Sequence, residues 1–280
     1  MKITGKTKIV GLFGYPVEHS LSPLMHNAAF RHLGLDYCYV TFLVHPALLK
    51  DAVNGIRALN LSGVNVTVPH KENVIQFLDE VSGEASFIGA VNTIKNDNGR
   101  LIGFNTDGKG FMKSLTEENV IVKDKKVLII GAGGASRAIG YHLCNDASLV
   151  YLYDIDVERV ESLKGHLNQL KGNVSVADHI SIKNKDFISS LDIIINATPL
   201  GLKESDPSPL NTELLDKDHI VCDLIYKETP LLKEASKKGC KTVNGLGMLL
   251  WQGVIAFQIW TGIEPPAELM REALVDKKIG

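Results

Sequence analysis

Short runs of β-branched and other apolar residues alternate with amphipathic stretches along the chain. Continuous apolar runs are typical of buried strands, whereas apolar residues spaced three and four apart are typical of helices that cover a sheet. Proline and glycine mark several boundaries, as at the helix expected over 22–32, with Pro23 in its first turn and Gly34 after its end. The pattern predicts strands at 8–13, 37–44, 62–68, 91–94, 100–104, 126–130, 149–153, 174–177, 192–196 and 220–224. It predicts helices at 22–32, 48–59, 70–79, 157–170, 246–260 and 267–274, and one more that begins at the glycine-rich turn after residue 130 and ends at about residue 144.

This alternation of strands and helices is typical of α/β folds with parallel sheets and right-handed crossovers. One exception is a hairpin between 91–94 and 100–104, joined through Asn96-Asp-Asn-Gly99. A second series of strands and helices begins near Lys125, and 280 residues suit about two domains. We therefore expect two α/β domains in tandem, with the last helices packing back onto the first.

A glycine-rich turn follows the strand at 126–130 and opens the next helix. The first glycine of such a turn permits a tight bend, and the second lets a pyrophosphate approach the backbone. The free N–H groups at the start of the helix then bind the phosphates. Ser136 stands where the fingerprint usually has a third glycine. The alternative is therefore an ordinary turn between strand and helix, in which the glycines serve only close packing. The residues expected to bind a dinucleotide here are Gly131, Ala132, Gly133, Gly134 and Ala135.

Asp154 ends the next strand, about 20 residues beyond the glycines, where the adenosine ribose of a dinucleotide lies. Its carboxylate can accept hydrogen bonds from both ribose hydroxyls, and it would repel a 2′-phosphate. At about 4 Å that repulsion is about 1 kcal/mol in water and about 4 kcal/mol at an effective dielectric of about 20. We therefore expect NAD to be preferred over NADP by roughly 10- to 10³-fold. The alternative is that Asp154 only caps the next helix, but Asp156 is better placed as that cap. Arg159 is the nearest cation that could still allow a 2′-phosphate to bind.

Composition excludes several classes of function. Lys plus Arg total 30 and Asp plus Glu total 32, so a net charge of −2 gives no electrostatic reason to expect binding to nucleic acid or to an anionic membrane. No uninterrupted apolar run reaches the roughly 18 residues of a membrane span, and the N-terminus lacks a signal-peptide pattern. The four cysteines are far apart in the sequence, so we expect neither disulfides nor a metal site. The absence of a disulfide pattern favours a cytoplasmic location.

Polar residues cluster at the expected strand ends and turns of the first 107 residues. Asn65 and Thr67 alternate with valines, so one face of that strand is polar and the other is core. Each polar residue also has an ordinary structural explanation. Ser20 and Ser22 could cap a helix, Lys71 could be a solvated surface charge, and Asn92 could be a turn residue. Their occurrence beside a dinucleotide-binding motif favours a role in the function.

Seven separated motifs, in one order and spanning almost the whole chain, resemble the shikimate dehydrogenases, a family that includes quinate/shikimate dehydrogenases. A set of motifs in one order is far more specific than any single motif. The motifs are His19-Ser-Leu-Ser-Pro-x-x-His-Asn27, Asn65-Val-Thr-Val-Pro-His-Lys71, Gly89-Ala-Val-Asn-Thr93, Asn105-Thr-Asp-Gly-x-x-Gly110, Gly131-Ala-Gly-Gly-Ala-Ser-Arg137, Asn196-Ala-Thr-Pro-Leu-Gly201 and Gly245-Leu-Gly-Met-x-x-x-Gln252.

The resemblance implies an N-terminal α/β substrate domain (1–107 plus 245–280) and a Rossmann-like, doubly wound dinucleotide-binding domain (108–244). It implies the reversible NAD(P)-dependent reduction of 3-dehydroshikimate to shikimate, in the biosynthesis of chorismate and aromatic amino acids. Lys71 and Asp107 match the catalytic pair of the family. The matching substrate-binding residues are Ser20, Ser22, Asn65, Thr67, Asn92, Asp107, Tyr226 and Gln252, and the matching cofactor-binding residues, besides the glycine-rich turn, are Asn196, Thr198, Leu224 and Gly245.

The chain departs from the family pattern at the end of the second cofactor strand. Members that use NADP typically carry Asn-Arg-Thr there, with the arginine on the 2′-phosphate, whereas this chain has Asp154-Ile155-Asp156. This difference points toward members that use NAD, some of which accept quinate. A quinate dehydrogenase is therefore one alternative, although the Ser-Leu-Ser spacing at 20–22 resembles members that prefer shikimate. A non-catalytic dinucleotide sensor is a second alternative, which the presence of both Lys71 and Asp107 disfavours. The sequence does not determine the oligomeric state, and a homodimer is one option.

Overall fold

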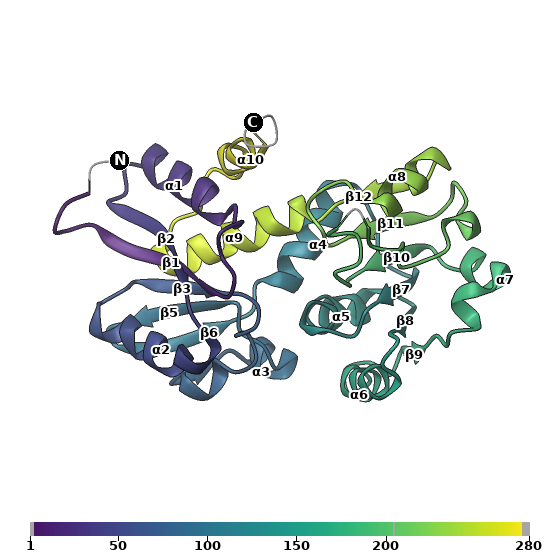
Figure 1. Ribbon diagram of the computed structural model, residues 1–280, viewed down its shortest axis with the longest axis horizontal. Coiled ribbons are helices and arrows are strands. Elements are labelled where there is room, and N and C mark those ends of the chain that lie inside the picture. The colour runs from purple at the N-terminus through teal and green to yellow at the C-terminus, as the bar shows by residue number, and fades with distance from the viewer. Residues whose placement is uncertain (1–2, 204, 276–280) are drawn as a thin grey trace. The chain divides into compact units, whose positions relative to one another are not determined.

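The computed structural model describes residues 3–203 and 205–275, which form two compact α/β units (Figure 1). The first unit comprises the chain up to Thr106 together with the part from Leu250 onward, and the second unit is Asp107–Leu249. A six-stranded sheet lies at the centre of each unit. The chain thus enters the second unit at Asp107, directly after a residue of the first.

The sheet of the first unit has the order β2-β1-β3-β5-β6-β4. Its first three strands are parallel, but β5 runs antiparallel to both β3 and β6. The predicted hairpin is confirmed, and its two turn residues, Asn98 and Gly99, have φ of 53° and 93°. The antiparallel strand of this hairpin is the exception to parallel pairing that the sequence predicted. The strands are β1 (Lys8–Gly14), β2 (Tyr37–Leu43), β3 (Gly63–Val66), β4 (Glu80–Val81), β5 (Thr93–Asp97) and β6 (Arg100–Phe104).

The expected helix over 70–79 is not formed. The carbonyl of Lys71 accepts the N–H of Val91 at 2.8 Å, so it is used in a tertiary contact rather than in a helical bond. Turns and one short 3-10 helix, Ile75–Phe77, take the helix's place. The helices of the first unit are α1 (Ser22–His32), α2 (Leu49–Ala58), α3 (Gly83–Ile88) and α10 (Ala267–Val275), and α9 (Leu246–Thr261) begins in the second unit and ends in the first.

The sheet of the second unit is entirely parallel, with the order β12-β11-β10-β7-β8-β9. The first strand of the series lies centrally and later strands extend the sheet in both directions, which is the doubly wound order of Rossmann folds. Its apolar strand residues, such as Leu128 and Ile194, are fully buried. The strands are β7 (Lys126–Ile130), β8 (Leu149–Tyr153), β9 (Val174–Val176), β10 (Ile193–Asn196), β11 (Ile220–Asp223) and β12 (Lys241–Val243).

Helix α4 (Asp107–Glu117) was not expected from the sequence, because glycines at 108 and 110 disfavour a helix. A Cβ at Gly108 would lie 2.4 Å from the carbonyl oxygen of Ala138 in α5, so glycine is what lets the two helices approach. Tertiary packing therefore overrides the local propensity. The other helices of this unit are α5 (Gly134–Asp146), α6 (Val157–Leu167), α7 (Lys185–Ser189) and α8 (Pro230–Lys237). Further 3-10 helices in the described residues of the two units are Pro46–Leu48, Ser181–Lys183 and Thr212–Leu214.

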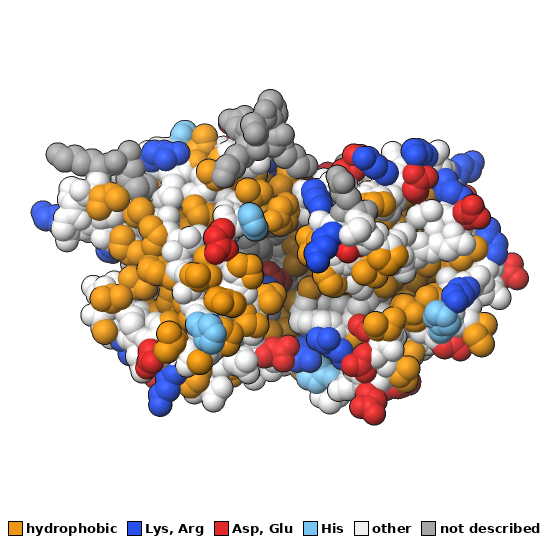
Figure 2. All heavy atoms as spheres, viewed as in Figure 1, with side chains coloured by type: hydrophobic (Ala, Val, Ile, Leu, Met, Phe, Trp, Pro, Cys, Tyr) orange, Lys and Arg blue, Asp and Glu red, His pale blue; other side chains and the backbone are white. Residues whose placement is uncertain are grey.

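The surface of the second unit carries charges of both signs. Figure 2 shows Lys and Arg side chains interspersed with Asp and Glu on the visible face of this unit. Hydrophobic side chains are more prominent on the visible face of the first unit. No helix in the described part of the chain combines the length and apolar character needed to cross a bilayer.

Candidate active site

The residues that the sequence predicts for cofactor binding lie at the carboxyl ends of the parallel strands of the second unit. Ile130, at the end of β7, is in register with Tyr153 on one side and Asn196 on the other, and Asn196 is in register with Asp223. The segments that follow these strands therefore emerge at one edge of the sheet. In an open α/β sheet this edge is where ligands bind.

The glycine-rich turn is shaped to admit an anion. Gly131 has φ of 106°, which favours glycine, and a Cβ there would lie 3.0 Å from Cγ2 of Thr198. Gly133 precedes α5 without a side-chain cap, and a Cβ built on it would meet only the guanidinium of Arg159, at 3.8 Å. The residues thus fit a dinucleotide. Uncapped backbone amides of α5, an open approach and a nearby cation are all suited to a pyrophosphate.

Asp154 holds this turn in place. One carboxylate oxygen accepts the N–H of Ala132 at 2.6 Å, and the other accepts the N–H of Asp156 at 3.0 Å. Asp156 in turn caps α6 by accepting the N–H of Arg159 at 3.0 Å, which confirms the predicted cap. The sequence did not indicate the contact with Ala132. Asp154 therefore has a structural task besides the ribose contact predicted for it.

A buried polar network supports the end of β10. Asn196 accepts hydrogen bonds from the backbone and hydroxyl of Thr198, at 3.0 and 2.7 Å, and its amide donates to Asp223 at 3.1 Å. Asp223 also accepts from the Thr229 hydroxyl at 2.8 Å, and burial raises the pKa of its carboxyl group. Sequence reasoning missed Asp223 and Thr229; the one available signal was a charged residue at the end of the apolar strand 220–224.

Leu224 and Gly245 complete this edge of the second unit. A Cβ at Gly245 would lie 2.0 Å from the carbonyl oxygen of Leu224, so only glycine allows this approach. Tyr226 follows shortly after β11 and is exposed. The structure thus brings the predicted cofactor-binding residues of this unit to the ends of neighbouring strands, with Tyr226 close to them in the chain.

In the first unit, the two serines predicted to bind a carboxylate lie together at the start of α1. Ser22 is the first residue of the helix and is buried, and its N–H donates to Oγ of Ser20 at 3.3 Å. Their position at a helix N-terminus suits a negatively charged group, because N–H groups and the helix dipole point toward it.

The segment that carries Lys71 is fixed on several sides. Thr67 donates its N–H to the carbonyl oxygen of Phe13 at 2.9 Å, immediately beyond the paired part of β3. The ring nitrogen Nε2 of the buried His70 lies 2.8 Å from the carbonyl oxygen of Val44. The backbone of Lys71 is held by the contact with Val91 described above. Lys71 therefore lies in a well-anchored turn that follows the carboxyl end of β3.

Asn65 and Asn92 are joined in a buried network. The amide of Asn65 donates to the carbonyl oxygen of Asn92 at 3.2 Å and to the Thr93 hydroxyl at 3.1 Å. Asn92 accepts the N–H of Thr106 at 2.8 Å and donates to its hydroxyl at 2.9 Å. Thr106 directly precedes Asp107, the first residue of α4, so Asn92 holds the segment that leads to the predicted catalytic carboxylate.

The predicted residues are thus divided between the units. Asp107 is buried at the start of the second unit, and its pairing with Lys71 stays a prediction. Gln252 is buried in the part of α9 that belongs to the first unit. The first unit contains Ser20, Ser22, Asn65, Thr67, Lys71, Asn92 and Gln252, and the second contains Asp107, Tyr226 and the predicted cofactor-binding residues.

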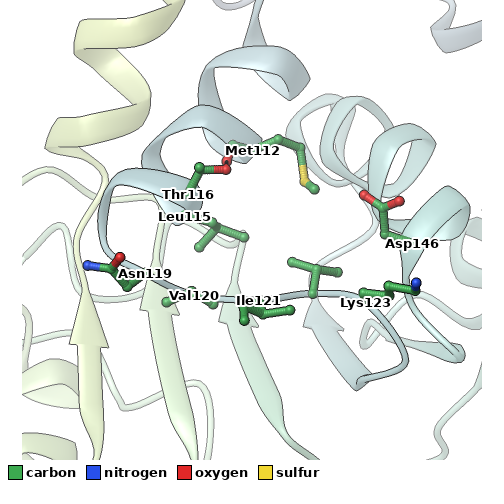
Figure 3. Close-up of a pocket in the computed structure, with 9 residues that line it drawn as sticks. Met112, Leu115, Thr116, Asn119, Val120, Ile121, Lys123 and Asp146 are labelled. Atoms are coloured by element: carbon green, nitrogen blue, oxygen red, sulfur yellow. Dashed lines mark hydrogen bonds between the residues drawn. The ribbon is translucent and has the colours of Figure 1, made fainter.

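A separate pocket of about 480 Å³ lies in the second unit, between α4, the segment that follows it and the end of α5 (Figure 3). Met112, Leu115 and Ile121 give it an apolar lining, and Asp146 and Lys123 are at one end. None of its lining residues is a predicted site residue. Within residues 3–203 and 205–275, no group of three or more His, Cys, Asp or Glu side chains could hold a metal ion.

The fold and the glycine-rich turn define a two-unit α/β protein with a Rossmann-type dinucleotide-binding unit. Residues 12–94 match the family model of the shikimate dehydrogenase substrate-binding domain, and residues 245–275 match that of the shikimate 5′-dehydrogenase C-terminal domain. The shikimate dehydrogenase (NADP(+)) of Methanocaldococcus jannaschii is 48% identical, covering 98% of this chain and 99% of the relative. The chain belongs to the shikimate dehydrogenase family.

Solved structures agree with this assignment. Shikimate 5-dehydrogenase from Listeria monocytogenes, in complex with shikimate and NAD, has a TM-score of 0.90 and 40% identity, covering 97% of this chain and 98% of that chain. Quinate dehydrogenase from Corynebacterium glutamicum, in complex with NAD, has a TM-score of 0.90 and 33% identity, covering 96% of this chain and 99% of that chain. The fold is therefore shared by relatives that differ in substrate.

Proposed function

We propose that this protein is a shikimate dehydrogenase, which reversibly reduces 3-dehydroshikimate to shikimate with a nicotinamide dinucleotide. The observation that carries the proposal is similarity to a shikimate dehydrogenase over nearly the full length of both chains. The presence of Lys71 and Asp107, each on an anchored segment, supports catalysis rather than dinucleotide sensing alone. Among the solved structures, identity to the quinate dehydrogenase is 33%, against 40% to the shikimate 5-dehydrogenase from L. monocytogenes, so shikimate is favoured over quinate.

The chemistry is divided between the cofactor and the protein. The dinucleotide, when bound, supplies or accepts the hydride at C3 of the substrate. Reduction places negative charge on the ketone oxygen. The ammonium group of Lys71 stabilises this charge and donates the proton, and in the reverse direction the amine of Lys71 accepts the proton from the C3 hydroxyl. Asp107 orients the ammonium group and balances its charge.

Binding of the substrate follows from the chemistry of the first unit. The hydroxyls of Ser20 and Ser22, at the N-terminus of α1, bind the carboxylate without a neutralising cation. Amide and hydroxyl side chains suit a ring of hydroxyl groups, because each can donate and accept. We assign this task to Asn65, Thr67, Asn92, Tyr226 and Gln252, together with Asp107.

For the cofactor we infer that either dinucleotide binds and that NAD is preferred. The relative from M. jannaschii is named for NADP(+), whereas the structure from L. monocytogenes contains NAD. In this chain Asp154 would repel a 2′-phosphate, and Ile155, where NADP-using members typically have arginine, is 90% exposed and offers no charge. The guanidinium of Arg159, close to Gly133, limits the discrimination against NADP.

Steady-state kinetics test these proposals together. Oxidation of shikimate and of quinate is measured with NAD and with NADP, in all four combinations. We expect the highest kcat/KM for shikimate with NAD, by roughly 10-fold or more over NADP, from the repulsion at Asp154. A higher value for quinate would reject the substrate assignment. An equal or higher value with NADP would reject the role of Asp154 in cofactor choice without affecting the substrate assignment.

We further propose that residues 1–107 plus 245–280 act as the substrate-binding domain and 108–244 as the dinucleotide-binding domain. The match of 12–94 to a substrate-binding family model supports this division. A cytoplasmic location is consistent with four cysteines that are all buried and free. Expression of the 108–244 segment alone tests the division, since it should bind a dinucleotide but not shikimate.

A further inference from the structure

We propose that Asp223 is a positioning residue for the dinucleotide, and that its buried carboxylate holds two loops of the cofactor site in one arrangement. The proposal rests on the function proposed above and adds a residue that the motifs do not contain. Asp223 ends β11, next to the end of β10 in the parallel sheet (Figure 1), and is 1% exposed. The two loops are the β10 loop, residues 196–201, and the β11 loop, residues 224–229.

The carboxylate of Asp223 accepts three hydrogen bonds, which reach both loops. Its Oδ1 accepts the side-chain amide of Asn196 at 3.1 Å and the backbone N–H of Ile225 at 3.0 Å. Its Oδ2 accepts the hydroxyl of Thr229 at 2.8 Å. Burial raises the pKa of the carboxyl group, whereas each of these donors favours its charged form. A carboxylate suits this position because both of its oxygens accept and neither carries a hydrogen that would oppose a donor.

The β10 loop is shaped by Asn196, whose side chain bonds only to protein groups. Its oxygen accepts the N–H and the hydroxyl of Thr198, and its second amide hydrogen goes to the carbonyl oxygen of Leu200 at 3.1 Å. The hydroxyl oxygen of Thr198 accepts the N–H of Leu200 at 3.2 Å. Neither Asn196 nor Thr198 has a hydrogen left to donate to a ligand. We therefore expect these two side chains to shape the loop rather than to donate hydrogen bonds to the dinucleotide.

The β10 loop lies directly beside the glycine-rich turn. A Cβ on Gly131 would lie 3.1 Å from the carbonyl oxygen of Ala197 and 3.0 Å from Cγ2 of Thr198. The space beside Gly131 therefore depends on where this loop lies. Since Asp223 holds Asn196, the carboxylate acts on the turn through the loop without contacting it.

The β11 loop connects the same carboxylate to Gly245. The N–H of Leu224 donates to the carbonyl oxygen of Asn196 at 3.0 Å, and the carbonyl oxygen of Ile225 accepts the N–H of Gly245 at 3.0 Å. Asp223 fixes Ile225 through its backbone, as described above. It thereby sets the backbone of Leu224 and Gly245, which are both predicted to bind the cofactor.

Thr229 holds the far ends of the two loops together. A Cβ on Gly201, which has φ of 106°, would lie 3.3 Å from Cβ of Thr229. A buried carboxylate that loses a donor is destabilised, so a change at Asp223 or Thr229 should displace the loops. The affinity for the dinucleotide should fall as a result. Binding of shikimate should change less, because most of the residues proposed to bind it lie in the first unit.

Isothermal titration with NAD tests the proposal. Asp223→Asn replaces one accepting oxygen with an amide group that opposes a donor, so we expect the dissociation constant to rise by about 10- to 100-fold. Thr229→Val removes one of the three bonds and should raise the dissociation constant by about 3- to 30-fold. The KM for shikimate should rise less in both variants. Unchanged affinity for NAD would overturn the proposal, as would a KM for shikimate that rises as much as the dissociation constant.

Two controls separate this role from general stability. The Thr229 hydroxyl also caps α8 by accepting the N–H of Leu232 at 3.4 Å. Asn184→Ala removes the corresponding cap of α7 in the same unit and should leave the affinity for NAD unchanged. Thr229→Ser keeps the hydroxyl and should bind NAD like the wild type. A Thr229→Ser variant that binds as weakly as Thr229→Val would assign the effect to packing and overturn the proposal.

The comparison of Thr229→Val with Thr229→Ser decides the question if Asp223→Asn does not fold. Failure of the proposed function is a distinct result, because the titrations need no turnover. A wild type that binds NAD but oxidises no shikimate with either dinucleotide would reject the function, and the affinities for NAD would still test the role of Asp223.

Discussion

The two units of this protein are both α/β, yet they prepare their sites with different parts of the polypeptide. The second unit uses backbone: a turn with positive φ at Gly131, uncapped amides at the start of α5, and a close backbone approach at Gly245. The first unit uses side chains, in a buried network that runs from the hydroxyl of Tyr39 in β2 through Asn65 to Asn92 and Thr93.

The difference follows from the ligands proposed for them. The pyrophosphate is the same in NAD and NADP and is bound well by backbone N–H groups, which almost any residue supplies once glycine has given the backbone its shape. A ring of hydroxyl groups with one carboxylate needs donors and acceptors in fixed places, and only particular side chains supply them. Binding of the dinucleotide by the second unit should therefore be sensitive to added Cβ atoms. Binding of the substrate by the first unit should be sensitive to the removal of single polar groups.

The largest expected effect is at Lys71. Lys71→Met removes the proton donor and the charge that stabilises the ketone oxygen, so we expect kcat for shikimate to fall by about 10²- to 10⁴-fold. Binding of the dinucleotide, followed by fluorescence titration, should be nearly unchanged. Lys50→Met, on the exposed face of α2, is the control and should retain activity. Substantial turnover by Lys71→Met would assign the proton transfer to another group.

A substitution that adds a Cβ atom to the glycine-rich turn tests the dinucleotide site of the second unit, which is formed by backbone groups. Gly131→Ala would introduce a methyl group at φ of 106° and 3.0 Å from Thr198, so we expect the dissociation constant of the dinucleotide to rise by roughly 10- to 100-fold. Gly165→Ala in α6, where a Cβ meets nothing within 4 Å, is the matched control and should bind normally. Isothermal titration with NAD measures both, and equal affinities would show that the turn tolerates a side chain.

The free energy of unfolding should decrease as pH falls, because His26 is buried and neutral in α1 and takes up a proton only when the protein unfolds. Burial lowers the pKa of His26 from its ordinary value of 6.5 to about 3, so its stabilising effect is present above about pH 6.5 and is lost progressively toward pH 3. The loss is about 1.4 kcal/mol per pH unit over this range. His26→Phe should show a shallower decline, measured by urea unfolding at several pH values and followed by the fluorescence of the two tryptophans, of which Trp260 lies 5.4 Å from His26 between ring centroids. Parallel declines in both proteins would exclude His26 as the source.

The smallest expected effect concerns cofactor choice. Ile155→Arg places a cation on an exposed side chain next to Asp154 without disturbing the bonds of Asp154 to Ala132 and Asp156. The ratio of kcat/KM for NADP to that for NAD should rise about tenfold, the equivalent of about 1.4 kcal/mol. Ile180→Arg, at another exposed isoleucine of the same unit, should leave the ratio unchanged. A ratio that does not respond to Ile155→Arg would place the discrimination elsewhere.

Much of the fold could be predicted from the chain because the pattern is local. The apolar strands of the second unit are continuous, and each is followed by its own turn residues, so the parallel sheet, the glycine-rich turn and the cap at Asp156 were all evident. Where the prediction was wrong, a distant contact decided the local structure. The segment 70–79 forms turns because Lys71 binds Val91, and α4 forms despite its glycines because Gly108 lets it pack on α5.

The sequence by itself determined the alternation of elements, the types of side chain available for chemistry and the family that their order resembles. Only the tertiary structure decided which of those side chains meet. Tyr39 is, in the sequence, one more residue of an alternating strand, and its hydroxyl reaches Asn65 only because β1 pairs with both β2 and β3. Hydrogen bonds between residues far apart in the chain depend on that pairing, and no local pattern of residues encodes it.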